Sequence, residues 1–198
     1  MDPQTFIFAG PSGSGKGTQV ELLREALSKA DDRKQFHFYT GDHFRAYMKN
    51  QADTLAAQIS TEINSVGGLQ PPFLAIWLWA EELVKNFTGE EHLIIDGTPR
   101  TITEAQALDS AMKFYKRKKP QIILIDVSVE EAKRRLLERA RTDDTEEGIS
   151  NRLSWYESEV KPAIDIYRED DYYQFHEING EQSVEEVHQE LMGSLALV

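Results

Sequence analysis

The chain has 198 residues, of which 34 are acidic and 22 basic, giving a net charge of −12 at pH 7. Its length fits one compact domain, and its acidity excludes a protein that coats nucleic acid or docks electrostatically on an anionic membrane. Cysteine is absent, which excludes disulfides, thiolate metal ligands and thiol catalysis. With no basic, apolar leader and no apolar run of about 20 residues, we expect a cytoplasmic protein without nucleic-acid or membrane partners.

Short apolar runs alternate with helical patterns along the chain. Buried strands are predicted over residues 5–10, 36–42, 92–97 and 121–127, with a weaker fifth at 172–178. Helices are predicted over residues 17–30, 129–141, 145–169 and 183–195. The third and fourth runs are almost continuously apolar, as in strands that are covered on both faces. The pattern therefore predicts an α/β fold with a five-stranded, parallel, doubly wound sheet.

Residues 10–18 read GPSGSGKGT, between the first predicted strand and the first predicted helix. The glycines allow a tight turn whose amides, with the helix N-terminus, can cradle phosphate oxygens. Lys16 can then reach the β- and γ-phosphates of a nucleotide. Gly17 separates this lysine from the hydroxyl of Thr18, which weakens the similarity to GTPases and motor ATPases. We predict a phosphate loop whose binding residues are Gly13, Ser14, Gly15, Lys16, Gly17 and Thr18.

The stretch from residue 43 to residue 90 interrupts the alternation of strands and helices. It contains helical patterns but no predicted strand, and the pairs Gly67-Gly68 and Pro71-Pro72 punctuate it. A helical insertion that forms a small subdomain fits this stretch.

The run LIIDG places Asp96 at the end of the third predicted strand. Ligands of open α/β sheets bind at the carboxyl ends of the strands. We therefore expect Asp96 to hold Mg²⁺, through water, beside the phosphate loop. The alternative is a carboxylate that only caps the following turn.

Five arginines follow the predicted strands or the helices after them, namely Arg45, Arg100, Arg139, Arg141 and Arg152. In so acidic a protein, cations gathered at one edge of the sheet indicate an anion site. Two nucleotides would account for them, since their phosphates repel each other unless neutralised. Such a site would catalyse phosphoryl transfer by positioning and charge neutralisation, without a general base when the acceptor is a phosphate anion.

Together these motifs resemble those of the adenylate kinases, within the wider family of nucleoside monophosphate kinases. GPSGSGKGTQ is similar to the family's phosphate loop, TGDHFR to its TGD-x-x-R element, and DGTPRTITEAQALD to its DGFPRT segment. RRLLER and RTDDTEEGISNRL resemble the arginine segments that flank the lid, and INGEQSVEEV the last strand and helix. These six segments stand in the family's order, and the similarity covers nearly the whole chain.

The resemblance implies that ATP and a nucleoside monophosphate react reversibly to two diphosphates, with Mg²⁺ and without zinc. It implies a monomer with one domain over 1–198, including a monophosphate-binding subdomain at 43–72 and a minimal lid at 139–144. By motif match, the catalytic residues would be Lys16, Arg100, Arg141 and Arg152. ATP would also contact Arg139 and the backbone near Gln182. The monophosphate would contact Thr40, Arg45, Gly97, Arg100 and Glu104, and the lid arginines would be tethered by Asp143 and Asp144.

The lid departs from the family pattern because only Ala140 separates Arg139 from Arg141. We expect closure to exclude water less well, and ATP hydrolysis without acceptor to be higher than in relatives with an ordinary short lid.

The acceptor pocket also departs from the pattern. Glu104 stands where the family usually has a glutamine facing the base, Thr98 replaces the aromatic of DGFPR, and Asn64 falls where an apolar residue is common. Glutamine both donates to and accepts from adenine, whereas an ionised glutamate only accepts, which suits guanine or uracil. The alternative is a solvated Glu104 at the start of a helix.

Three functions stay open at this stage. The first is an adenylate kinase, which phosphorylates AMP. The second is a kinase for GMP, UMP or CMP. The third is a non-catalytic, ATP-binding regulator, against which the retained arginines argue.

Overall fold

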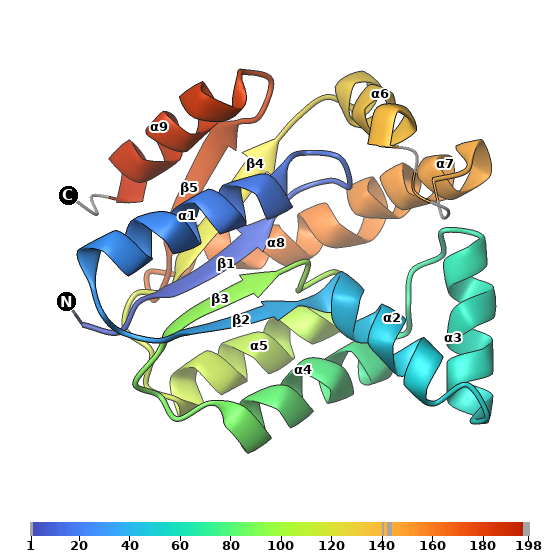
Figure 1. Cartoon of the computed structure of the whole chain (residues 1–198), viewed down its shortest axis with the longest axis horizontal. Coiled ribbons are helices and arrows are strands. Elements are labelled where there is room, and N and C mark those ends of the chain that lie inside the picture. The colour runs from blue at the N-terminus through green and yellow to red at the C-terminus, as the bar shows by residue number, and fades with distance from the viewer. Residues whose placement is uncertain (1, 140, 142–143, 196–198) are drawn as a thin grey trace.

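The computed structural model describes residues 2–139, 141 and 144–195 (Figure 1). The strands are β1 (Thr5–Ala9), β2 (Gln35–Tyr39), β3 (His92–Asp96), β4 (Gln121–Asp126) and β5 (Gln174–Asn179). The helices are α1 (Lys16–Ala30), α2 (Thr40–Asn50), α3 (Leu55–Ser65), α4 (Pro72–Asn86), α5 (Ile102–Phe114), α6 (Val129–Arg139), α7 (Glu146–Trp155), α8 (Lys161–Arg168) and α9 (Val184–Leu195), and a π-helical turn, η1 (Tyr156–Val160), joins α7 to α8. None of the described helices is long and apolar enough to cross a bilayer.

The strands form one parallel sheet in the order β2-β3-β1-β4-β5. Helices α1 and α9 cover one face, and α4, α5 and α8 cover the other (Figure 1). Strands β1 and β3 are neighbours, and the helices that follow them, α1 and α5, lie on opposite faces, so the topological switch point lies between the carboxyl ends of these two strands. The predicted five-stranded, parallel, doubly wound fold is confirmed.

Each central strand contributes side chains to both halves of the core. In β1, Phe6 and Phe8 pack with α1 and α9, while Ile7 packs on the opposite face. In β3, Ile94 packs with α1 and α9, and Ile95 packs on the opposite face. All five side chains are at most 1% exposed, which explains why these runs are apolar without alternation.

Two predicted elements differ from the structure. The second strand ends at Tyr39, and Thr40 begins α2, because the Thr40 hydroxyl donates to the carbonyl of Asp96 at 3.0 Å and turns the chain at the sheet edge. The single helix predicted over 145–169 is interrupted by η1, just before Pro162. Proline lacks an amide donor and its ring crowds the carbonyl four residues earlier, that of Ser158, so a wider turn replaces the regular helix.

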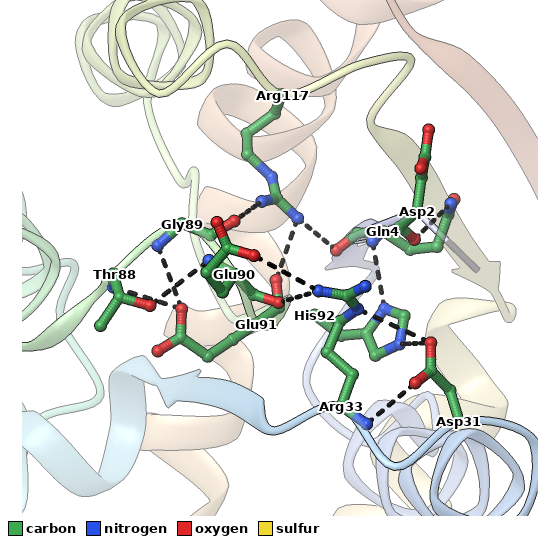
Figure 2. Close-up of polar contacts among 10 residues, drawn as sticks. All are labelled: Asp2, Gln4, Asp31, Arg33, Thr88, Gly89, Glu90, Glu91, His92 and Arg117. Carbon is green, nitrogen blue, oxygen red and sulfur yellow. Dashed lines mark hydrogen bonds and ion pairs between the residues drawn. The ribbon is translucent and has the colours of Figure 1, made fainter.

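A buried arginine clamps the amino edge of the sheet (Figure 2). Arg117 is 5% exposed and donates to the hydroxyl of Thr5 at 2.7 Å and to the carbonyls of Gln4 at 2.7 Å, Gly89 at 3.0 Å and Glu91 at 3.2 Å. These acceptors come from the start of β1 and from the loop before β3. One guanidinium therefore ties the start of β1 to the loop before β3 through three carbonyl oxygens and a hydroxyl.

The same edge contains a buried histidine. His92 is fully buried; its Nδ1 accepts from the amide of Gln4 at 3.1 Å, and its Nε2 lies 3.5 Å from the carboxylate of Asp31 (Figure 2). Burial lowers the pKa of His92, and the charge of Asp31 opposes that effect. A neutral imidazole therefore joins β3 to β1 and to the loop after α1.

We expect Arg117→Met to lower the free energy of unfolding by about 2–4 kcal/mol, because four acceptors lose a buried, charged donor. Urea unfolding followed by circular dichroism measures the change. The matched control is Lys118→Met, since the Lys118 side chain is 85% exposed and lies 3.7 Å from the carboxylate of Asp2. Its effect should stay below about 0.5 kcal/mol; equal effects of the two variants would contradict the clamp.

Candidate functional site

The loop between β1 and α1 is shaped by glycines in close contact with neighbouring backbone. A Cβ on Gly10, at φ +137°, would lie 2.4 Å from the carbonyl oxygen of Ile125. A Cβ on Gly13, at φ +89°, would lie 2.7 Å from that of Ala132. No larger side chain fits either position. The loop is therefore held against β4 and α6 and leads directly into α1.

Lys16 is held at this loop by backbone carbonyls. Its Nζ donates to the carbonyl oxygens of Gly10 and Pro11, both at 2.8 Å. Burial lowers the pKa of Lys16 to about 8, and the negative charge of Asp96 opposes this effect. The ammonium is thus preorganised beside the loop, and a phosphate anion would restore its ordinary affinity for a proton.

A cleft of about 480 Å³ opens over the phosphate loop. Its lining includes the sequence-predicted residues Gly13, Gly15, Lys16, Gly17, Thr18, Asp96, Gly97, Arg139 and Arg141. These residues come from the loop after β1, the end of β3 and the region around the end of α6. The structure therefore brings nine of the eighteen predicted site residues together around one cleft, in a volume that suits a nucleotide.

Asp96 ends β3 with its carboxylate almost completely buried, at 3% exposure. Burial raises its pKa, and the charges of Lys16 and Arg100 oppose that effect. Its Oδ1 has no hydrogen-bond partner among the described residues. An unpaired oxygen at the edge of an anion cleft fits a water bound to Mg²⁺. No group of three or more His, Cys, Asp or Glu residues within the described part of the chain could hold a metal by itself.

Two other predicted residues lie around the N-terminus of α2. The hydroxyl of Thr40 contacts the Asp96 carbonyl and lies 3.3 Å from the hydroxyl of Thr98. Arg45 donates from Nη2 to the carboxylate of Asp42 at 2.5 Å. Arg45 does not line the main cleft, so the structure places it beside the cleft rather than in it.

Arg100 follows β3 and is partly buried, with its guanidinium oriented by two groups. Its Nε donates to the carbonyl of Gly97 at 2.8 Å, and its Cζ lies 5.5 Å from the ring centroid of Trp155. It shares a small cavity of about 40 Å³ with Lys16, Gly97 and Trp155. Arg100 and Lys16 thus line one cavity.

Glu104 is fully buried, not solvated at the start of α5. Its Oε2 accepts from the amide of Arg100 at 3.1 Å and from the hydroxyl of Thr98 at 3.3 Å, and its Oε1 accepts from the hydroxyl of Thr101 at 3.4 Å. Its own amide donates to the Thr101 hydroxyl at 3.2 Å, so Thr101 caps the N-terminus of α5. Burial raises the pKa of Glu104, while the positive charge of Arg100 opposes the rise. Its carboxylate therefore holds the loop that presents Arg100.

The lid side is organised around Asp144. Its two oxygens accept from Nε of Arg139 at 2.9 Å and from Nη2 at 2.8 Å, and Oδ1 also accepts from Nη2 of Arg152 at 2.6 Å. The amide of Arg141 donates to Oδ2 at 3.2 Å. Burial alone would raise the pKa of Asp144, but these donors lower it. Asp143, the other predicted tether, lies outside the described residues.

Gln182 lies in the loop after β5 and does not line the cleft. Its amide donates to the carbonyl of Asn179 at 3.0 Å and to the carboxylate of Glu190 at 2.6 Å.

Sequence reasoning missed Arg135, which lines the cleft from α6. It donates to the carbonyl of Gly180 at 2.8 Å and to that of Ser14 at 3.4 Å, so it joins the phosphate loop to the loop after β5. Arg135 lies one helical turn before Arg139, and this spacing could have identified it.

Two aromatic residues were missed as well. Tyr39 lines the cleft at the end of β2, with Arg45 Cζ 5.6 Å from its ring centroid. Its position just before TGD was an available signal. Trp155 contacts Arg100 across the fold, and nothing in the local sequence indicates that contact.

Comparisons with known proteins agree with this geometry. The family model described as adenylate kinase matches residues 8–172. Adenylate kinase 1 of Nostoc sp. (strain PCC 7120) is 37% identical over 190 residues, 96% of this chain and 97% of the relative. Adenylate kinase of Leptospira biflexa serovar Patoc is 34% identical over 194 residues, which are 96% of this chain and 98% of the relative. Adenylate kinase of Prochlorococcus marinus (strain MIT 9303) is 33% identical over 177 residues, which are 89% of this chain and 91% of the relative.

We expect Asp144→Asn to lower the free energy of unfolding at pH 7 by about 1–3 kcal/mol, because Arg139 and Arg152 lose a charged acceptor. The carboxylate stays ionised in the folded protein below its ordinary pKa of 3.8. Its contribution is therefore present above pH 3.8 and is lost as the pH falls through the lower folded pKa, so the two proteins should converge in acid. Urea unfolding at several pH values tests this.

The matched control is Glu138→Gln on α6, whose carboxylate is 62% exposed in its pair with Arg134. An exposed pair of this kind should contribute at most about 0.5 kcal/mol. A loss in Asp144→Asn no larger than in Glu138→Gln would contradict the tether.

Proposed function

This chain belongs to the adenylate kinase family and is a nucleoside monophosphate phosphotransferase, and we propose that it transfers a phosphoryl group reversibly from ATP to AMP, with Mg²⁺, giving two ADP. The observation that carries the proposal is the single cleft shared by Lys16, Asp96 and the arginines of α6 and the lid. A partly buried ammonium, an unpaired carboxylate oxygen and several guanidinium groups suit two phosphate chains and the cation between them.

On the ATP side, the amides of residues 13–18 would cradle the phosphates at the N-terminus of α1. Lys16 would leave its carbonyl acceptors for the phosphate oxygens. Arg139 would bind along the ATP phosphates or base, and the backbone near Gln182 would lie beside the base.

Mg²⁺ bound with ATP would offset phosphate charge and so reduce repulsion between the two substrates. Asp96 would hold this ion through water, since its Oδ1 is buried, unpaired and at the cleft. Lys16, Arg100 and Arg141 would supply the remaining positive charge.

On the acceptor side, Thr40, Arg45, Gly97 and Arg100 would hold the monophosphate. A phosphate oxygen of AMP forms a bond to the γ-phosphorus while the bond from that phosphorus to the β-bridging oxygen breaks, and ADP leaves. No proton needs to be removed from an anionic acceptor, so the arginines Arg141 and Arg152 would act by positioning and charge stabilisation alone.

We also propose the division of the chain into a core, the helical segment 43–72 for the monophosphate, and a minimal lid at 139–144. Helices α2 and α3 form most of that segment. The short lid supports a higher rate of ATP hydrolysis without acceptor, because a smaller closing segment excludes less water.

Glu104 is the basis for a second candidate acceptor. A carboxylate beside the base would favour GMP or UMP over AMP. The bonds of Glu104 to Thr98, Thr101 and the Arg100 amide occupy both of its oxygens, which supports AMP and a role for Glu104 in holding Arg100. CMP completes the set of alternative acceptors.

Product formation from Mg-ATP with AMP, GMP, UMP or CMP, and from Mg-ATP alone, tests the proposal. We expect ADP to form fastest with AMP, and Lys16→Met to reduce that rate at least about hundredfold, since it removes a preorganised charge. The exposed Lys29, at the end of α1, is the matched control as Lys29→Met. Faster turnover of GMP or UMP would favour the second acceptor, and hydrolysis alone would contradict a kinase.

The depressed pKa of Lys16 predicts a pH dependence of ATP binding. Above about pH 8 the free protein holds a neutral amine, so ATP must restore the proton on binding. We expect kcat/KM for ATP to decline above pH 8 while kcat stays level, because bound phosphates keep the ammonium charged. In Lys16→Arg, ATP affinity measured by calorimetry should be weaker but independent of pH. A level kcat/KM up to pH 9.5 would contradict this account of Lys16.

A further inference from the structure

The loop between α3 and α4 is docked on α7. Gly67, at φ +65°, lies so close to α7 that a Cβ there would be 2.3 Å from the carbonyl oxygen of Gly148. Asn151 donates from its side chain to the carbonyl of Val66 at 2.8 Å. Trp155 donates from its indole nitrogen to the carbonyl of Gly67 at 2.9 Å.

The α7 residues in these contacts share one face of the helix. Positions 148, 151 and 155 are separated by three and four residues, which places them in one row. The contacts join segments more than 80 residues apart in the chain. They attach the end of the helical segment 43–72 to the core, next to the cleft.

The ring of Trp155 has a second contact, with Arg100. The guanidinium carbon lies 5.5 Å from the ring centroid, within the range of a cation–π interaction. A contact with the ring leaves the N–H groups of the guanidinium available as donors, and one of them, Nε, donates to the Gly97 carbonyl. The indole of Trp155 therefore contacts both the α3–α4 loop and Arg100, which follows β3.

We propose that Trp155 is a positioning residue for the monophosphate acceptor. Its N–H fixes the α3–α4 loop, and its ring orients Arg100, so that both sides of the acceptor site are set before the acceptor arrives. Prior ordering lowers the entropy lost on binding. This inference rests on the proposed function for its kinetic consequence, whereas the docking of the loop is independent of it.

Two substitutions separate the two contacts. Trp155→Phe keeps an aromatic face for Arg100 and removes the N–H donor, whereas Trp155→Leu removes both. For Trp155→Phe we expect the KM of the acceptor to rise about three- to tenfold, the loss of one hydrogen bond, with the KM of ATP and kcat within about twofold. For Trp155→Leu we expect kcat to fall as well, because in the proposed function Arg100 both holds the acceptor phosphate and supplies positive charge for the transfer.

The matched control is Trp77→Phe. Trp77 is an exposed indole on α4 that packs edge-on against Tyr47, and no contact with the α3–α4 loop or with Arg100 is among those described for it. This variant should leave both KM values unchanged. Thermal unfolding of all three variants shows how much stability each loses.

Amide hydrogen exchange in the protein without nucleotide provides a readout that does not depend on catalysis. The amides of Gly67 and Gly68 donate to the carbonyls of Asn64 and Ile63 at 3.0 and 2.9 Å. We expect both to exchange faster in Trp155→Phe than in the wild type, and at the wild-type rate in Trp77→Phe.

Unchanged exchange in Trp155→Phe would overturn the docking role. Faster exchange with an unchanged KM for the acceptor would overturn the positioning role. A rise in both KM values in proportion to a lower Tm would mean that Trp155 is only structural. If the wild-type protein transferred no phosphoryl group, the proposed function would fail, and the exchange rates would still test the docked loop.

Discussion

The site depends on the close approach of the phosphate loop to its neighbours. Gly10 and Gly13 lie against the carbonyls of Ile125 and Ala132, where no Cβ fits, so the loop has one position relative to β4 and α6. That position presents Lys16 at the carboxyl edge of the sheet, opposite Asp96 on the adjacent strand. Because Asp96 is buried and Lys16 is partly buried, their charges are less screened than they would be in water, and each shifts the pKa of the other toward the charged form. A polyphosphate bound there would supply the negative charge that balances Lys16 and the arginines around the cleft.

The cations of this acidic protein are individually oriented before any substrate binds. Asp144 holds Arg139 and Arg152, and backbone carbonyls hold Arg100 and Arg135. Preorganised charges cost less reorganisation during phosphoryl transfer than charges that must be gathered at that moment. Helix α7 has a part in two of these arrangements, since it carries Arg152 toward the lid and Trp155 toward Arg100 and the α3–α4 loop. A movement of the lid can therefore be transmitted through α7 to Arg100 and the α3–α4 loop, and the reverse.

Much of the fold could be predicted from the sequence because local signals and the global fold agree. Continuous apolar runs indicated the strands, and the glycines and lysine of residues 10–18 indicated the phosphate loop. The end of β2 was placed too late, since the turn at Thr40 depends on a bond to Asp96, more than 50 residues away. The burial of Glu104, the clamp by Arg117 and the contacts of Trp155 depend likewise on partners that only the folded chain brings together. The interruption of the helix after α7 was the exception, because Pro162 gave a local signal.

The central claim is that the chain has two nucleotide subsites that meet at one transfer point. Calorimetry with a bisubstrate in which a polyphosphate chain joins two adenosines tests it most directly, since such a ligand occupies both subsites at once. The account predicts one ligand per chain, a submicromolar Kd, and displacement by ATP and AMP together more readily than by either alone. Binding no tighter than that of ATP, with displacement by ATP alone, would contradict it.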